Sequence, residues 1–353
     1  MNVLFDARTI APHYPGVGRY GLGLLGALAR LPGTHVTALV EAGAPAPLDL
    51  PHLDAARVRT LADQLGTPAR LRRELAPGPW VYHSPFYLYP YGIGLPAVVT
   101  LYDVTPLTHP AGYSAPTRAL YALAHRVAAR RARRLITLTA AARDECVAQL
   151  GLPASKFVVV PPGHTPSLVP PTELASEPFL LYVGINKPHK NLPALVEAYA
   201  ALGRGAPPLR LAGPLDPRYP EAQQAAERAG LGDRVRFLGR VSEAELGRLY
   251  RQATLLVLPS LAEGFGFTVL EAMAGGTPVA CSDLPVLREV AGEAALYFDP
   301  RQPATITAAL DQALRQPELR AALRQRGLAR AGEFTWQRAA QATLAVYESA
   351  LAG

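Results

Sequence analysis

The sequence predicts an α/β protein built from two Rossmann-like domains, and three observations support this fold class. Short apolar or β-branched runs alternate with longer amphipathic segments, a pattern typical of parallel sheets covered by helices. A proline-rich stretch interrupts the alternation near the middle of the chain, and the same alternation then begins again. The chain has 353 residues, of which 49% are hydrophobic, so it is long enough to form two cores.

The proline-rich stretch marks the expected domain boundary. Residues 161–178 contain six prolines, which disfavour helices and central strands. We therefore expect a first domain over residues 1–164, a linker over 165–177 and a second domain over 178–334. The tail, residues 335–353, has the pattern of a further amphipathic helix, and its periodicity does not assign it to either domain.

Each half contains six candidate strands. In the first half they are NVLFDA, HVTALV, VYHS, AVVTL, LITL and FVVV, and in the second half PFLLYVG, LRLAG, RVRFLG, TLLVLPS, TPVAC and AALYF. One helix has a clear start, because Ser242 and Glu245 have the spacing of a capping box. Leu246, Leu249 and Tyr250 then share one face of that helix.

Charge and cysteine content limit the classes of protein. The excess of 35 basic over 28 acidic side chains lies in the first 165 residues, which hold 16 basic and nine acidic ones. Such a surface suits phosphates or anionic lipid. A nucleic-acid partner is not expected, since zinc-ligand spacings, an RNA-binding aromatic motif and a long basic tail are all missing.

The expected location is the cytoplasm, with the inner face of the membrane as an option. Cys146 and Cys281 are too far apart to suggest a secreted disulfide framework. The opening MNVLFDAR already has the pattern of a buried strand rather than a leader, and no run of 18 apolar residues could span a bilayer.

The stretch PGVGRYG raises the possibility of a dinucleotide site. Gly16, Gly18 and Gly21 match G-x-G-x-x-G, and Glu41 follows about 20 residues later. However, the first glycine of that fingerprint follows its strand almost directly, whereas TIAPHYP separates Gly16 from the strand here. Two other interpretations remain: a glycine-rich loop that approaches a diphosphate, and a helix start with glycines for close packing.

The second half carries a stronger pattern in LPSLAEGFGFTVLEAMAGGTPV. A strand is followed by Glu263, a glycine turn and a helix that contains Glu271. The free amides at such a helix start attract anions, and carboxylates accept hydrogen bonds from sugar hydroxyls. Two further loops follow strands, one with Lys187, His189 and Lys190 and one with Gly213, and loops at the carboxyl ends of parallel strands bind ligands.

These segments resemble the retaining glycosyltransferases of family 4, which have the GT-B architecture. The resemblance rests on P-S-x-x-E-G-F-G with E-A-M-A-x-G-x-P-V, on V-G with K-N-L, on G-V-G-R-Y and on V-V-T-L-Y-D-V, and it covers nearly the whole chain. It implies two Rossmann-like domains that face each other across a cleft, with the donor on the second domain, the acceptor on the first and the tail helix crossing back to the first.

The resemblance also implies roles for individual residues. Glu263 would bind the hydroxyls of the donor sugar, and Glu271 those of the ribose. Lys190 would neutralise the donor diphosphate. The glycines would form a loop over that diphosphate in the first domain. The backbone positions expected at the nucleotide-sugar are Gly16, Gly18, Gly213, Gly264, Phe265, Gly266 and Phe267.

The sequence departs from the family in the segment TLYDVTP. Many members have a histidine where this chain has Tyr102, and a tyrosine is a poor base at neutral pH. Asp103 is then the remaining candidate for touching the acceptor, or it caps the turn before Pro106. Lys187 or His189 would replace an arginine that often precedes the phosphate lysine. His13 and His83 are weaker candidates for ligand contacts.

A basic segment, TRALYALAHRVAARRARRLITL, predicts an amphipathic helix that could lie on anionic lipid. Its arginines are Arg118, Arg126, Arg130, Arg131, Arg133 and Arg134, and its apolar residues include Leu120, Leu123 and Val127. The simpler interpretation is a helix that covers the sheet with its apolar face.

We expect a retaining, metal-independent glycosyltransferase without a cofactor. It would move a hexose from GDP-mannose or a UDP-sugar to a glycan or a lipid-linked hydroxyl in polysaccharide biosynthesis, with Glu263, Lys190, Asp103 and Tyr102 at the reaction centre. Two alternatives stay open: an NAD-dependent or epimerase-type enzyme on a similar fold, and a catalytically silent module that binds sugar nucleotides.

Overall fold

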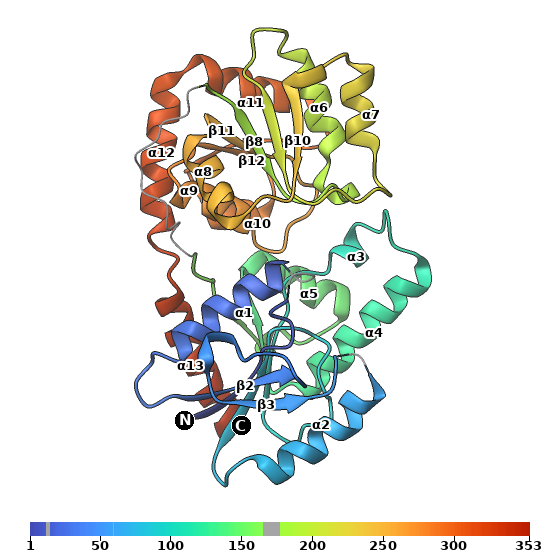
Figure 1. Cartoon of the computed structure of the whole chain (residues 1–353), viewed down its shortest axis with the longest axis vertical. Coiled ribbons are helices and arrows are strands. Elements are labelled where there is room, and N and C mark those ends of the chain that lie inside the picture. The colour runs from blue at the N-terminus through green and yellow to red at the C-terminus, as the bar shows by residue number, and fades with distance from the viewer. Residues whose placement is uncertain (12–14, 59, 165–176) are drawn as a thin grey trace. The chain divides into compact units, whose positions relative to one another are not determined.

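The computed structural model describes residues 1–11, 15–58, 60–164 and 177–353 (Figure 1). The chain divides into two compact units. The first comprises Met1–Thr108, Ser114–Gly163 and Phe334–Gly353, and the second comprises His109–Tyr113 and His164–Glu333. Except for Glu177, the expected linker lies outside the described residues.

The first unit is a parallel sheet of seven strands with helices. Its strands are β1 (Asn2–Asp6), β2 (His35–Glu41), β3 (His52–Ala55), β4 (Trp80–Ser84), β5 (Ala97–Thr100), β6 (Arg134–Thr137) and β7 (Phe157–Val159). The helices are α1 (Pro15–Leu28), α2 (Leu61–Glu74), α3 (Thr105–Thr108), α4 (Ala115–Arg131), α5 (Ala140–Leu150) and α13 (Trp336–Ala352). The strand order is β3-β2-β1-β4-β5-β6-β7, with every pair parallel. The chain adds β2 and β3 on one side of β1 and then β4 to β7 on the other side, so the switch point lies between β1 and β4.

The second unit repeats this plan with six strands. They are β8 (Leu180–Val183), β9 (Leu209–Ala212), β10 (Val235–Gly239), β11 (Leu255–Leu258), β12 (Val279–Ser282) and β13 (Ala295–Phe298). The helices are α6 (Leu192–Ala201), α7 (Glu221–Arg228), α8 (Glu243–Gln252), α9 (Phe267–Ala274), α10 (Pro285–Ala291), α11 (Pro303–Arg315) and α12 (Pro317–Ala331). The order β10-β9-β8-β11-β12-β13 is that of a doubly wound fold, with its switch point between β8 and β11.

Burial explains why the central strands read as continuous apolar runs. Every residue of β11 and β12 is buried, as is every residue of β5, because helices cover both faces of a parallel sheet. The edge strand β3 was not predicted. Its sequence, HLDA, has only one buried residue and therefore lacks such a run.

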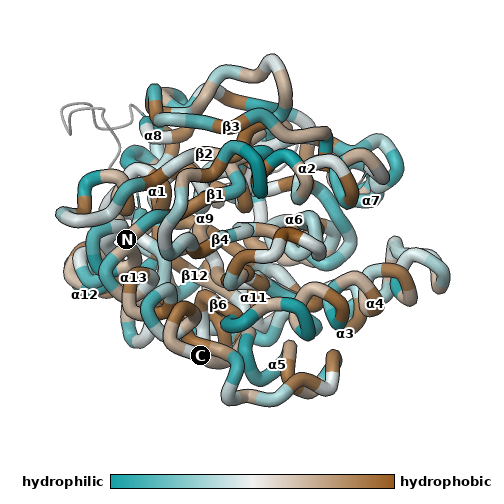
Figure 2. Tube along the Cα trace, turned by 90° about the horizontal axis from the view of Figure 1, so that it is seen from below, coloured by the Kyte–Doolittle hydropathy of each residue, from teal (hydrophilic) through white to brown (hydrophobic). Residues whose placement is uncertain are grey.

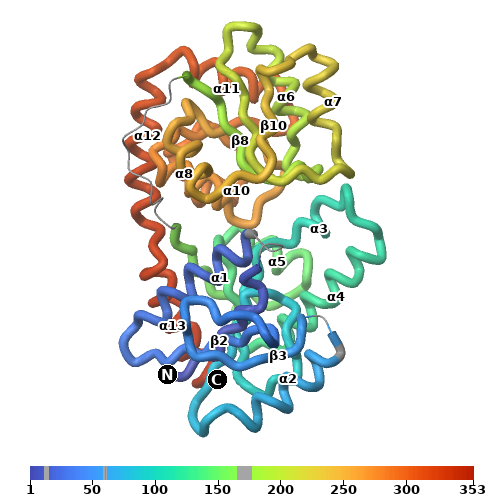
Figure 3. The backbone as a smooth tube through the Cα atoms, in the orientation of Figure 1, coloured from blue at the N-terminus to red at the C-terminus, as the bar shows by residue number. Residues whose placement is uncertain are grey.

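The C-terminal helix α13 belongs to the first unit and lies beside α1, as Figure 3 shows for the blue and red ends of the chain. Trp336 packs so closely that a Cβ on Gly23 would come within 2.1 Å of its ring, and a Cβ on Gly163 within 2.1 Å of its backbone nitrogen. The tail helix therefore crosses back to the first unit, as the family resemblance implied.

A buried hydrogen-bond network joins α13 to the sheet. His83 at the end of β4 has Nδ1 2.6 Å from the Tyr347 hydroxyl and Nε2 2.9 Å from Thr100 Oγ1. Burial lowers the pKa of His83 to about 3, so the ring is neutral at physiological pH. Both ring nitrogens of His83 are thus used in hydrogen bonds that hold α13 and β5 to β4.

Candidate functional site

Two loops of the second unit meet at its switch point, one after β8 and one after β11. The β8 loop continues into a 3₁₀ turn, Pro188–Lys190, and Asn191 then adopts a left-handed conformation before α6. The Asn191 side chain donates to the carbonyls of Pro259 (3.2 Å) and Pro300 (2.7 Å). The backbone nitrogen of Leu261 donates to His189 O at 2.7 Å, so the two loops are held together by backbone and side chain.

Lys190 and Glu263 form an ion pair between these loops. Lys190 Nζ lies 2.8 Å from Glu263 Oε1, and the side chains are 18% and 11% exposed. The buried Ser260 hydroxyl donates to the same carboxylate oxygen at 2.7 Å. The sequence predicted Lys190 and Glu263 as site residues, and the structure brings them together. Ser260 was missed, since only the fold shows that its hydroxyl reaches the carboxylate.

The start of α9 follows directly. Gly266 precedes the helix with φ of 97°, and a Cβ there would come within 2.6 Å of Leu287 Cδ2, so both conformation and space favour glycine. Within the described part of the chain, no side chain caps this helix. The Phe265 and Phe267 rings pack with centroids 4.9 Å apart on either side of Gly266. This helix start can accept an anion, as the sequence predicted.

Glu271 lies in the second turn of α9. Its Oε2 accepts a hydrogen bond of 2.9 Å from the hydroxyl of Tyr250, a buried residue of α8. Tyr250 was expected only as an apolar packing residue, because the pattern within a helix gives no sign of what its hydroxyl meets across the helix interface.

Backbones approach closely at the ends of β8 and β9. Gly213 follows β9 with φ of 141°, and a Cβ there would come within 2.1 Å of Gly184 O. Gly213 therefore lies at the carboxyl edge of the sheet, where the sequence placed it, and its lack of a side chain is required for packing.

His189 is the central residue of the 3₁₀ turn. Burial, with the charge of Lys190 adding to it, lowers the pKa of His189 to about 4. The ring is therefore neutral near pH 7. Lys187, the other replacement considered for the family arginine, lies just before this turn.

In the first unit, Tyr102 and Asp103 follow β5. The Tyr102 hydroxyl is shielded from solvent and has no hydrogen-bond partner among the described residues, and its ring packs edge-on against Tyr20 at 5.4 Å. Burial, and then Tyr20, raise the pKa of Tyr102 well above its usual value. Asp103 Oδ1 accepts from the backbone nitrogen of Thr105 at 2.8 Å, which is the capping role considered from the sequence.

The glycine motif does not form a loop. Gly16 and Gly18 lie inside α1, which begins at Pro15. A Cβ on Gly18 would be 3.4 Å from Thr9 O, and one on Gly21 would be 3.2 Å from Ile10 Cγ1, whereas Gly16 faces open space. The expected loop at Gly16 and Gly18 is thus corrected to a helix start. Gly18 and Gly21 let α1 pack on the segment that leaves β1; His13 lies outside the described residues.

A buried ion cluster occupies the turn after β1. The Arg8 guanidinium donates to Asp6 at 2.8 and 2.6 Å and to Asp63 at 2.5 Å, and the Tyr82 hydroxyl donates to Asp6 at 2.5 Å. Burial raises the pKa of Asp63, although Arg8 opposes this shift. A dinucleotide fold needs its glycine turn at this position, and a bulky ion cluster stands there instead.

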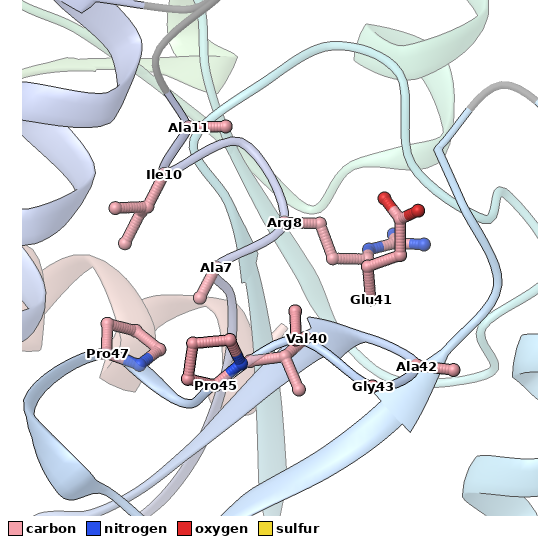
Figure 4. Close-up of a pocket in the computed structure, with 11 residues that line it drawn as sticks. Ala7, Arg8, Ile10, Ala11, Val40, Glu41, Ala42, Gly43, Pro45 and Pro47 are labelled. Carbon is pink, nitrogen blue, oxygen red and sulfur yellow. The ribbon is translucent and has the colours of Figure 1, made fainter.

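A cavity of about 400 Å³ lies beside this cluster, between the ends of β1 and β2. Figure 4 shows Arg8 and Glu41 on one side, and Ile10, Pro45 and Pro47 on the other. Glu41 ends β2, as a dinucleotide site would require. Among the described residues that line the cavity, however, none belongs to the glycine motif.

The basic helix is α4, and its leucines point outward. Leu120 and Leu123 are 68% and 58% exposed, and Arg130 and Arg131 are exposed at its end. Hydrophobic and hydrophilic residues alternate along α4 in Figure 2. Arg126, by contrast, donates to the carbonyls of Leu150 and Gln149 within the unit. Over the described residues, every helix is too short or too polar to cross a bilayer.

Comparisons with known proteins identify the family. Residues 15–163 match the family model described as "Glycosyl transferase 4-like domain", and residues 170–330 match "Glycosyl transferases group 1". The O-antigen chain mannosyltransferase B of Escherichia coli is 31% identical over 284 residues, which cover 76% of this chain and 74% of that protein. The MMP alpha-(1->4)-mannosyltransferase of Mycolicibacterium hassiacum is 33% identical over 64% of this chain and 56% of its own length.

Solved structures share the fold. Sucrose-phosphate synthase from Thermosynechococcus elongatus has a TM-score of 0.76 at 20% identity, over 100% of this chain and 99% of that one. Anabaena HepE in complex with UDP and glucose has a TM-score of 0.79 at 18% identity, over 99% of this chain and 100% of that one. Together with the two parallel sheets, these findings show that the chain belongs to the family 4-like glycosyltransferases of the GT-B class.

Proposed function

We propose that this glycosyltransferase moves a hexose from a nucleotide-diphosphate sugar to a hydroxyl acceptor with retention of configuration. The observation that carries the proposal is the Lys190–Glu263 pair beside the uncapped start of α9. A cation, a carboxylate and free helix amides at one sheet edge match the three parts of a donor: the diphosphate, the sugar hydroxyls and the negative charge that grows as the sugar leaves.

The reaction can be written with these groups. The bond between sugar C1 and the diphosphate oxygen breaks, and the acceptor oxygen bonds to C1 from the same face. Lys190 and the α9 amides stabilise the negative diphosphate, while Glu263 holds the sugar hydroxyls. Because Tyr102 has a raised pKa and Asp103 uses one oxygen to cap α3, we assign the acceptor proton to the leaving phosphate oxygen.

Glu271 would bind the ribose hydroxyls, and the backbone after β9 at Gly213 and at the start of α9 at Gly266 would lie near the nucleotide. For the donor we propose GDP-mannose or a UDP-sugar. Two similar proteins are named as mannosyltransferases, and HepE, similar in fold, was crystallised with UDP and glucose. The acceptor would be a glycan or a lipid-linked hydroxyl bound by the first unit.

We further propose that the reaction uses neither a metal ion nor an organic cofactor, because Lys190 supplies a positive charge where a divalent cation would otherwise act. Transfer should then be unchanged after treatment with EDTA. A loss of activity that Mg²⁺ or Mn²⁺ restores would contradict this part of the proposal.

The test is to incubate the protein with GDP-mannose or UDP-glucose and measure release of the nucleoside diphosphate and the anomeric configuration of the new bond by NMR. Glu263→Gln should abolish transfer, whereas Glu318→Gln, at an exposed carboxylate of the same unit, should leave it unchanged. An inverted product would overturn retention. No turnover with any nucleotide-sugar would favour the silent binding module.

We also propose that α4 contacts an anionic bilayer at the cytoplasmic face of the membrane. Leu120 and Leu123 are three residues apart and so share one exposed helix face, and Arg130 and Arg131 complement anionic headgroups at its end. Contact would bring the first unit to lipid-linked acceptors.

A further inference from the structure

Tyr250 is tied to the carboxylate that the proposed function assigns to the donor ribose. Its hydroxyl donates to Glu271 Oε2 at 2.9 Å, although the two residues lie on different helices, α8 and α9. Tyr250 is 5% exposed and Glu271 is partly exposed. The hydroxyl therefore approaches the carboxylate from the protein side, while the carboxylate remains accessible.

The Tyr250 side chain also meets α9 close to the backbone, independently of that hydrogen bond. A Cβ added to Gly275, the C-cap of α9, would come within 3.2 Å of Tyr250 Cβ. The absence of a side chain at Gly275 thus lets Tyr250 lie directly against the end of α9. Tyr250 thus lies against the C-cap of this helix through its Cβ and bonds a carboxylate one turn earlier through its hydroxyl.

We infer that Tyr250 is a positioning residue that orients Glu271 for the two ribose hydroxyls of the donor; this inference rests on the proposed function. A partly exposed carboxylate can sample several rotamers, and that freedom is lost when it binds a diol. A charge-assisted hydrogen bond from a rigid, buried phenol selects one rotamer before the ligand arrives. A carboxylate has about four acceptor positions, and the tyrosine bond occupies one of them.

The test compares ribose with deoxyribose. Titration calorimetry would measure binding of GDP and UDP and of their 2′-deoxy forms to wild type and variants. The nucleotide whose base binds more tightly is used. The ratio of the affinity for its ribose form to the affinity for its 2′-deoxy form reports the contribution of the ribose hydroxyls. Tyr250→Phe keeps the ring and removes the hydroxyl. Tyr199→Phe is the matched control, because it removes a buried hydroxyl that donates to Pro207 O in the same unit.

Tyr250→Phe should reduce the ratio between ribo and deoxy affinities about threefold to tenfold, as expected for a weakened charge-assisted hydrogen bond. It should raise KM for the donor with little change in kcat, and Tyr199→Phe should change neither. Should Tyr250→Phe not fold, Gly275→Ala provides a second route, because its Cβ would push Tyr250 Cβ by a few tenths of an ångström and should reduce the same ratio.

Glu271→Gln separates the two proposals. If Glu271→Gln abolishes the discrimination and Tyr250→Phe leaves it at the wild-type ratio, Tyr250 is not a positioning residue, while the ribose site stands. If neither substitution changes the ratio, the ribose assignment of Glu271 fails, and the role of Tyr250 fails with it.

Discussion

The Glu263 carboxylate accepts hydrogen bonds from Lys190 and Ser260 on a single oxygen, Oε1, at 2.8 and 2.7 Å. The lysine that we assign to the diphosphate is thus held by the residue that we assign to the sugar. Donor binding has to share or replace this ion pair, so the affinity for a phosphate and the geometry of the carboxylate are coupled.

Lys190→Ala should weaken binding of the nucleoside diphosphate about 10- to 100-fold, because a charge-assisted contact with phosphate is lost. Binding of the parent nucleoside should change little. Calorimetry with UDP and uridine, or with GDP and guanosine, checks this difference. Equal losses for the nucleoside and the diphosphate would show that Lys190 supports the loop rather than the phosphate.

Glu263→Gln should separate binding from turnover. The substitution removes the negative partner of Lys190, so the diphosphate should bind as tightly as in wild type or a few-fold more tightly. Transfer should fall by at least about 100-fold if the carboxylate holds the sugar in the transition state. The measurements are calorimetry with the nucleoside diphosphate and steady-state release of product. A large loss of diphosphate affinity would contradict the assigned role.

Gly213→Ala should destabilise the protein by about 1 to 3 kcal/mol, because its Cβ would overlap the carbonyl oxygen of Gly184 and its φ of 141° is strained for other residues. Thermal unfolding followed by circular dichroism gives the shift in Tm. Gly205→Ala is the control, since a Cβ at Gly205 meets open space. Equal stability of the two variants would show that the strand ends relax freely.

Stability should fall as the pH is lowered from about 6.5 toward 3. The pKa of His83 is about 3 in the folded chain and that of an unfolded histidine about 6.5, so the unfolded state binds more protons in this range. His125, with a pKa lowered by burial to about 4, adds to this slope. His83→Gln should flatten the dependence of the unfolding free energy on pH, measured by urea denaturation. His35→Gln, at an exposed strand end, should not.

The double substitution Leu120→Ser and Leu123→Ser should reduce co-sedimentation with phosphatidylglycerol vesicles at low salt at least about threefold, because two exposed leucines would otherwise enter the interface. Leu65→Ser is a matched control, since Leu65 is 67% exposed on another helix of the first unit. Failure of the wild-type protein to sediment with these vesicles would contradict membrane contact through α4.

Periodicity predicted the fold well because buried parallel strands are nearly pure apolar runs. It found every strand except β3, whose four residues include only one buried side chain. The helix starts at Ser242 and near Asn191 were also recognisable, and the structure has Ser242 Oγ accepting from Glu245 N at 3.2 Å. Local chemistry of this kind is encoded within a few residues of the chain.

Contacts between distant segments were harder to predict. The sequence indicated Lys190, Glu263 and Glu271, but it could not show that Ser260 and Tyr250 bond to the two carboxylates, because those contacts depend on how loops and helices pack. The glycine motif forms the helix start that was one of the two interpretations, rather than the loop that the resemblance implied, and the sequence could not decide between them for a related reason. A glycine that admits a neighbouring backbone and a glycine that admits a phosphate look the same in sequence, and of the three motif glycines only Gly16 faces open space.

The return of α13 to the first unit has a consequence for biosynthesis. Trp336 and Tyr347 of α13 complete the core of the first unit, whose strands all precede residue 160. About 170 residues of the second unit are therefore synthesised between those strands and α13. The second unit can reach its final state while the first still lacks a helix beside α1. The half of the protein that is translated first therefore cannot acquire its last helix until the other half has been synthesised.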